Sequence, residues 1–159
     1  AKATADARKR EVTAARLLSV NATNIATYGL QLASMDRNRE SLISLGRGLR
    51  DYSNRARELK PIVEDRYVTF LSDLSPEVTY LLSLVDNALA IFKQFDLHAS
   101  APDTEHMEMC ARTFLNQLRS LTEAAIRATR ELDAIAAPGI PSQIEAIVNR
   151  SNADRSEQP

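Results

Sequence analysis

Residues 107–135 read MEMCARTFLNQLRSLTEAAIRATRELDAI, and this stretch decides the fold class. Its small and apolar residues return at alternating steps of four and three: Met107, Ala111, Phe114, Leu118, Leu121, Ala125, Ala128, Leu132 and Ile135. A repeat that averages about 3.5 residues keeps one stripe of an α-helix facing a neighbouring helix. The stretch therefore predicts a long helix that packs lengthwise, and it contains no motif that fixes a reaction or a ligand.

Two further segments carry the same repeat. The first series is Ala14, Leu18, Asn21, Ile25, Tyr28, Leu32 and Met35, and the second is Leu42, Leu45, Leu49, Tyr52, Ala56, Leu59 and Val63. Gly46 and Gly48 lie within the second series. Each glycine costs about 1 kcal/mol relative to alanine in a helix interior. The pair therefore indicates a close helix crossing, a bend or a locally melted turn.

Small residues also favour close packing of the first helix. Ala22, Ala26, Gly29 and Ala33 lie three or four positions apart, on neighbouring turns of that helix. Because residues at this spacing share one side of a helix, they allow another backbone to approach closely.

Prolines and capping residues set the expected helix boundaries. Ser75-Pro76-Glu77 combines a capping serine, a proline at the first helical position and an acid in the first turn, so a helix begins there. Pro61 is expected to kink or restart the preceding helix, and Pro138-Gly139 to end the long helix. Helices are thus predicted at about residues 6–35, 37–72, 76–96, 103–137 and 141–149.

These elements predict an all-α protein. Four long helices with short connections most simply form an antiparallel up-down four-helix bundle with heptad-like packing, followed by a short fifth helix whose Ile144, Ile147 and Val148 pack back on it. Residues 1–150 are expected to form one domain, and the polar residues 151–159 a flexible, disordered tail. The rival architecture keeps the first two helices as one continuous rod that pairs with another copy.

The helix that begins at Ser75 is apolar nearly all round. Its run from Val78 to Phe92 is too short to cross a bilayer and carries Asp86 and Asn87 at its middle, where a membrane would disfavour them. A soluble helix of this composition must be covered on more than one side. It is therefore either the central element of the fold or a helix with one face left for docking.

One cluster of side chains could bind a metal: Asp103, Glu105, His106, Met109 and Cys110. One helical stretch presents only two or three of these to a common point, whereas a soft metal requires more converging ligands. Cys110 is therefore interpreted as a small core residue and His106 as part of a solvated helix start. No catalytic residue, metal site or cofactor is predicted, and no enzyme activity is expected, because phosphate loops, nucleophile elbows and paired Glu-x-x-His elements are absent from the sequence.

Charge is balanced overall and uneven along the chain. The formal net charge is −1, but residues 1–66 hold 13 Lys/Arg against 8 Asp/Glu, and residues 67–109 hold one Lys against seven acids. The second helix has an arginine-rich exterior that acids on the same helix can neutralise. A nucleic-acid binder would be more basic, so no nucleic-acid partner is expected.

The sequence therefore favours a non-catalytic helical-bundle module for protein–protein interaction or assembly, binding a partner or a second copy through helix faces. The expected partner-binding residues are Arg47, Arg50, Tyr52, Arg57, Tyr80, Leu84, Ile91 and Phe95. The alternative is an extracytoplasmic four-helix sensor excised from a membrane receptor, with a small ligand between its helices. Membrane anchoring outside this segment and the cellular compartment are left open.

Overall fold

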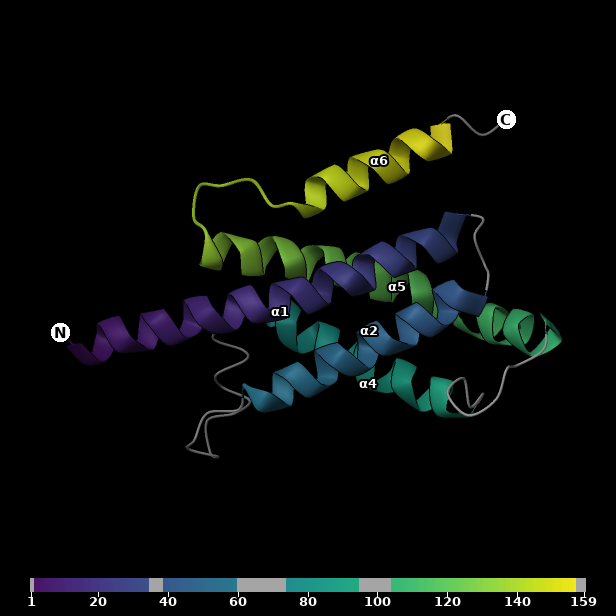
Figure 1. The fold of residues 1–159 in the computed structure, drawn as a ribbon, viewed down its shortest axis with the longest axis horizontal. Helices are drawn as coiled ribbons and strands as arrows, with labels where there is room; N and C mark the ends of the chain where they lie inside the picture. Colours follow the sequence, from purple (N-terminus) through teal and green to yellow (C-terminus); the bar gives the residue numbers. More distant parts are fainter. Residues whose placement is uncertain (1, 35–38, 60–73, 95–103, 157–159) are drawn as a thin grey trace.

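The computed structural model describes residues 2–34, 39–59, 74–94 and 104–156, and its regular structure in these ranges is helical. The helices in chain order are α1 (Lys2–Ser34), α2 (Arg39–Glu58), α4 (Pro76–Gln94), α5 (Thr104–Ala136) and α6 (Ile144–Ser156). The predicted all-α class is confirmed, and the helix contacts are compatible with a bundle (Figure 1).

The heptad positions form most of the core. On α5, the described members of the series are buried at Leu118, Leu121, Ala125, Ala128 and Leu132, and Ile135 packs against the core from its margin. The side chains of Met107, Ala111 and Phe114 lie outside the described part of the chain. The buried members on the first two helices are Ala14, Leu18, Ile25, Leu32, Leu42, Leu45, Leu49, Tyr52 and Ala56. Helical periodicity thus identified the inward faces of three helices.

Close helix crossings account for two of the glycines, Gly29 and Gly46. A Cβ atom on Gly29 of α1 would lie 2.2 Å from Thr122 Oγ1 of α5, and one on Gly46 of α2 would lie 3.3 Å from the Phe92 ring of α4. A Cβ atom on Gly48 of α2 would lie 3.8 Å from Ile25 Cγ1 of α1, which is an ordinary van der Waals contact. Of the three alternatives for the Gly46 and Gly48 pair, close crossing is observed at Gly46, whereas Gly48 has room for a methyl group.

Contact pairs along the helices give their relative directions. Ser19 of α1 bonds to Asp133 of α5, while Gly29, further along α1, faces Thr122, earlier on α5. These two helices therefore run in opposite directions. The rod architecture is wrong, because α2 packs back along α1 (Figure 1). The up-down order of all four long helices stays a prediction.

Serine caps start two of the helices. Ser75 Oγ accepts a hydrogen bond from the Glu77 backbone N at 3.1 Å, which satisfies an otherwise unpaired donor at the start of α4. Ser142 Oγ does the same for the Ile144 backbone N at 3.3 Å at the start of α6. Between these points α5 ends at Ala136, next to Pro138 and Gly139 as predicted.

Three boundaries differ from the prediction. The first helix starts at Lys2 rather than residue 6, because alanines of high helix propensity alternate through its first turns. The second helix ends at Glu58, two residues before Lys60 and three before Pro61. The remainder of the predicted helix, at residues 60–72, lies outside the described residues. Residues 151–156 continue α6 as helix instead of forming a disordered tail. No proline or glycine interrupts Ile144–Ser156, so a helix once started propagates through its polar residues.

Helix α4 is not a central element covered all round. Its buried side chains, Val78, Leu81, Val85, Ala88 and Phe92, form one stripe that packs between α2 and α5. The opposite face carries exposed polar residues, including Ser83, Asp86, Asn87 and Lys93. The other large aliphatic residues of α4 are partly buried along the edges of this stripe.

The different space around Gly29, at the α1–α5 crossing, and Gly48, between α2 and α1, predicts different effects for two alanine substitutions. Gly29→Ala should destabilise the fold by about 1–3 kcal/mol, because the new methyl overlaps Thr122, whose Cβ and Cγ2 are also within 3.2 Å. Gly48→Ala meets only ordinary contacts and should be neutral or stabilising by up to about 1 kcal/mol. Urea unfolding of both variants measures the difference, and equal effects would show that α1 and α5 do not cross this closely.

Candidate binding pocket

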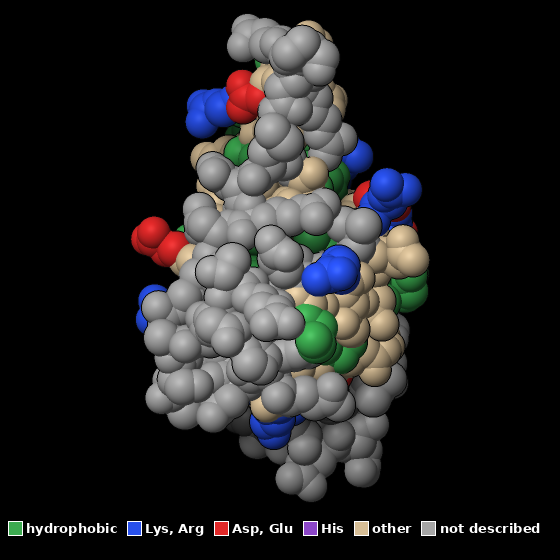
Figure 2. Space-filling model, turned by 90° about the vertical axis from the view of Figure 1, so that its right-hand side faces the viewer, with side chains coloured by type: hydrophobic (Ala, Val, Ile, Leu, Met, Phe, Trp, Pro, Cys, Tyr) green, Lys and Arg blue, Asp and Glu red, His purple; other side chains and the backbone are tan. Residues whose placement is uncertain are grey.

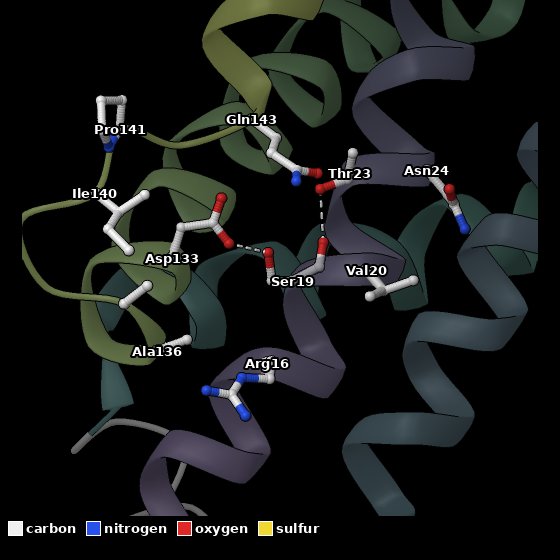
Figure 3. Close-up of a pocket in the computed structure, with 11 residues that line it drawn as sticks. Arg16, Ser19, Val20, Thr23, Asn24, Asp133, Ala136, Ile140, Pro141 and Gln143 are labelled. Atoms are coloured by element: carbon white, nitrogen blue, oxygen red, sulfur yellow. Dashed lines mark hydrogen bonds between the residues drawn. The ribbon is translucent and has the colours of Figure 1, made fainter.

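A pocket of about 370 Å³ lies where α1 passes the end of α5 and the loop that leads to α6 (Figure 3). Its walls come from one face of α1, from the last turn of α5 and from the α5–α6 loop. The lining residues are Arg16, Ser19, Val20, Thr23, Asn24, Asp133, Ala136, Ala137, Ile140, Pro141 and Gln143. This volume lies in the range of about 300–1,000 Å³ that is usual for ligand pockets.

Asp133 holds the polar floor of the pocket together. One carboxylate oxygen accepts a hydrogen bond from the Ser19 hydroxyl of α1, and the other accepts one from the Ser142 hydroxyl of the α5–α6 loop. Ser142 in turn caps α6. A single carboxylate on α5 therefore joins α1, α5 and the start of α6.

The same hydrogen bonds limit the chemistry of the floor. The Ser19 and Ser142 hydroxyls both donate to Asp133, and the lining contains no histidine or cysteine that could activate a nucleophile. The arrangement is suited to holding the pocket's shape.

A tight turn places the loop side chains at the pocket mouth. The Ala137 backbone N donates to the Asp133 carbonyl at 2.8 Å, and the Ile140 backbone N donates to the Ala137 carbonyl at 3.2 Å. Gly139 has φ of 82°, a left-handed conformation that glycine adopts without strain. The turn leaves Ile140 at the surface instead of returning it to the core.

The rim of the pocket is apolar and exposed. Ile140 is 66% exposed and Val20 of α1 is 61% exposed, and the two lie on either side of the Ser19–Asp133 hydrogen bond (Figure 3). Leu17, 37% exposed, lies one turn from Val20 on α1. We call the three exposed apolar residues that line the pocket, Val20, Ile140 and Pro141, the apolar rim.

An ion pair holds α6 beside the pocket. Arg130 of α5 contacts both carboxylate oxygens of Glu145, with Nη2 to Oε2 at 3.1 Å, and Ile144 is fully buried next to it. The hydrogen bond from Arg130 lowers the pKa of Glu145, and the same bond raises the pKa of Arg130. Both side chains are more than 40% exposed, so solvent screens this pair.

The residues predicted to bind a partner lie elsewhere, on α2 and α4. Arg47, Arg50 and Arg57 are exposed on α2, and Tyr80 is 47% exposed on α4. Leu84 and Ile91 are partly buried against the core. Phe95 lies outside the described residues.

The assignment of Tyr52 to a binding surface is wrong. Its side chain is fully buried between helices, and its hydroxyl donates to the Val78 carbonyl of α4 at 3.2 Å. A tyrosine at a heptad position with a polar acceptor within reach is a core residue that orients α2 against α4. It cannot contact a partner while the fold is intact.

The sequence predicts Cys110 as a small core residue and His106 as part of a solvated helix start. The structure does not describe either side chain, so both stay predictions. Both residues belong to the first turns of α5, at the end of the molecule away from the pocket. Figure 2 views that end, where most of the surface belongs to residues that are not described. Among the residues that are described, no group of three or more His, Cys, Asp or Glu side chains could hold a metal ion.

Sequence reasoning missed the pocket because its signals are spread over the chain. Arg16, Val20, Thr23 and Asn24 share one side of α1 by helical spacing, but their partners come more than one hundred residues later. The only local hint was two apolar residues, Ile140 and Pro141, directly after a Pro-Gly stop.

Comparison of the chain with protein-family models, with curated proteins and with solved structures finds no match. Within the described residues, the helices fall short of the length and apolar character that a membrane span requires.

Asp133→Ala should destabilise the protein by about 1–3 kcal/mol, because two serine hydroxyls lose a charged acceptor at once. Ser19→Ala in the same background should add little, since the bond it removes is already gone. Asp86→Ala is the matched control, because exposed Asp86 meets Ser53 only at 3.4 Å. Urea unfolding tests these variants, and additive effects of the first two would rule out the shared bond.

Acid should remove the contribution of Glu145. Its pKa is lowered in the folded state, so its stabilising effect is present above the ordinary glutamate pKa of about 4.3 and disappears as the pH falls through the lowered value. The Tm of the native protein should therefore exceed that of Glu145→Gln slightly at pH 7, and the difference should shrink as the pH falls below the ordinary glutamate pKa. Glu131→Gln, an exposed control on α5, should lack this pattern, and a difference between native protein and Glu145→Gln that persists in acid would contradict the ion pair.

Proposed function

We propose that the chain is a non-catalytic helical-bundle module for protein–protein interaction, and that the apolar rim is its docking site. The observation that carries the proposal is the position of Val20 and Ile140. They are the two most exposed large apolar side chains in the described part of the chain, and both line the same pocket. Exposed apolar residues gathered round a hollow are typical of binding surfaces.

Their burial would supply anchoring energy. Complete burial of a valine or isoleucine side chain is worth about 1.5–3 kcal/mol, so covering the exposed parts of both side chains would supply about 2–4 kcal/mol. That is too little for a complete interface, and it fits two anchor residues within a larger contact. The partner is a different chain or a second copy of this one.

A small-molecule sensor is the second candidate, and the pocket between helices is the observation in its favour. Ligand sites of that kind bury about 70–90% of the ligand surface. Here one side of the hollow opens to solvent between Val20 and Ile140. A protruding side chain of a partner would be covered by its own chain on that side, so we place the protein partner first.

A photo-crosslinking residue at position 140 tests the docking site in cells that make the protein. We expect one defined crosslinked product from position 140, and its loss when Val20 is changed to Ser. Position 80 is the matched control, because Tyr80 is also exposed and lies on α4, away from the lining. Val20 is largely exposed, so Val20→Ser should leave the fold intact, which circular dichroism checks.

Light scattering of the native protein then identifies the kind of partner. A dimer that Ile140→Ser converts to monomer would assign a second copy, and a monomer with a heterologous crosslink would assign a different chain. Crosslinks from position 80 and none from position 140 would move the docking site to α4. Absence of both crosslinks and of self-association would overturn the interaction module.

A further inference from the structure

The first half of α1 carries four basic residues that form no ion pair with a described acid. We define the basic segment as Arg8, Lys9, Arg10 and Arg16; all four side chains are exposed, and none pairs with a carboxylate of a described residue. Two arginines of α5 differ in this respect, because Arg127 pairs with Glu77 and Arg130 with Glu145. Residues 2–16 hold five basic and two acidic residues in a chain of net charge −1.

The basic segment is continuous with the pocket. Arg16 lines the pocket, and the first turns of α1 project past the end of α5 (Figure 1). Lys9, Arg16 and Val20 share one exposed stripe of the helix, because they lie seven and four residues apart. Cationic side chains therefore lead from the apolar rim towards the N-terminus.

The other charge in the pocket is already engaged. Both carboxylate oxygens of Asp133 accept serine hydroxyls, whereas the Arg16 guanidinium has no carboxylate partner among the described residues. A ligand that enters over the apolar rim meets a cation, Arg16, that has no carboxylate partner among the described residues. Charge complementarity then requires an anion near an apolar group.

We propose that the pocket and the basic segment together bind an acidic protein segment that carries one apolar anchor side chain. This inference depends on the proposed function, because the anchor occupies the same apolar rim. At about 1.5 Å per residue, Arg16 and Lys9 lie about 6 and 16 Å from Val20 along α1. A helical partner therefore presents acids about four and eleven residues from its anchor.

Two other polyanions fit the surface less well. A nucleic acid offers a continuous row of phosphates, whereas the basic segment is short and ends at the apolar rim of a pocket whose floor contains the Asp133 carboxylate. An anionic membrane would need a flat apolar face beside the cations, and the rim is formed by a helix and a raised loop. A protein segment supplies both a protruding side chain and nearby carboxylates.

Synthetic alanine-based helical peptides provide the test. The probe has one leucine, with glutamates four and eleven residues from it; the matched peptide has glutamine at both positions. Fluorescence anisotropy should show the glutamate peptide binding the full chain about tenfold tighter than the glutamine peptide at low salt, with the difference reduced by added salt. Arg16→Glu should weaken the glutamate peptide by tenfold or more and leave the glutamine peptide nearly unchanged.

Arg57→Glu is the control variant, because it makes the same charge change at an exposed position on α2. It should leave both affinities unaltered. Ile140→Ser should weaken both peptides, because it removes part of the apolar rim.

The outcomes separate the two proposals. Equal binding of both peptides, still lost in Ile140→Ser, would overturn the acidic partner and keep the docking site. Two results would overturn both the acidic segment and its binding to the apolar rim. One is an affinity for the glutamate peptide that Ile140→Ser leaves unchanged, and the other is no binding of either peptide at about 1 mM. Arg16-dependent binding to phosphatidylserine vesicles without peptide binding would replace the protein partner with a membrane surface.

Discussion

The close contact between α1 and α5 is the constraint on which the rest of the structure depends. These two helices make the most extensive contact in the described chain, and small side chains bring them together: Ala22, Ala26, Gly29, Ala125 and Ala128 are buried. Two helices packed through such residues leave little room to slide or rotate. The contact therefore fixes which residues meet further along, and Ser19 lies opposite Asp133 because Gly29 faces Thr122.

Asp133 links the α1–α5 contact to the α5–α6 loop at the surface. Its side chain is partly buried, and two serine hydroxyls satisfy its two carboxylate oxygens. Because one of these hydroxyls also caps α6, the start of α6 is placed relative to α1 and not only relative to its own helix. The pocket is the space between α1 and the α5–α6 turn, because this turn does not cover the face of α1 beside it.

The sequence was most informative where one local rule acts alone. Heptad spacing predicted the buried faces of α1, α2 and α5, and Ser75-Pro76-Glu77 predicted the start of α4. Tyr52 shows the limit, because its heptad position indicated burial while its polar group suggested a surface role, and only a carbonyl on another helix decides between them. The pocket could not be predicted, since Ser19 and Asp133 are far apart in sequence and unremarkable in type.

The distribution of apolar side chains separates stability from recognition. Sequence composition placed the apolar excess on α4, but Leu84 and Ile91 are used there to seal the margin of the core. Val20 and Ile140 are largely exposed and do not belong to the buried core. A turn holds Ile140 outward, and a Cβ atom added at Gly139 of this turn would meet nothing within 4 Å. Such a loop can change its side chains without disturbing the α1–α5 contact. A fixed frame of small buried residues beside an exposed apolar rim supports the proposed binding role.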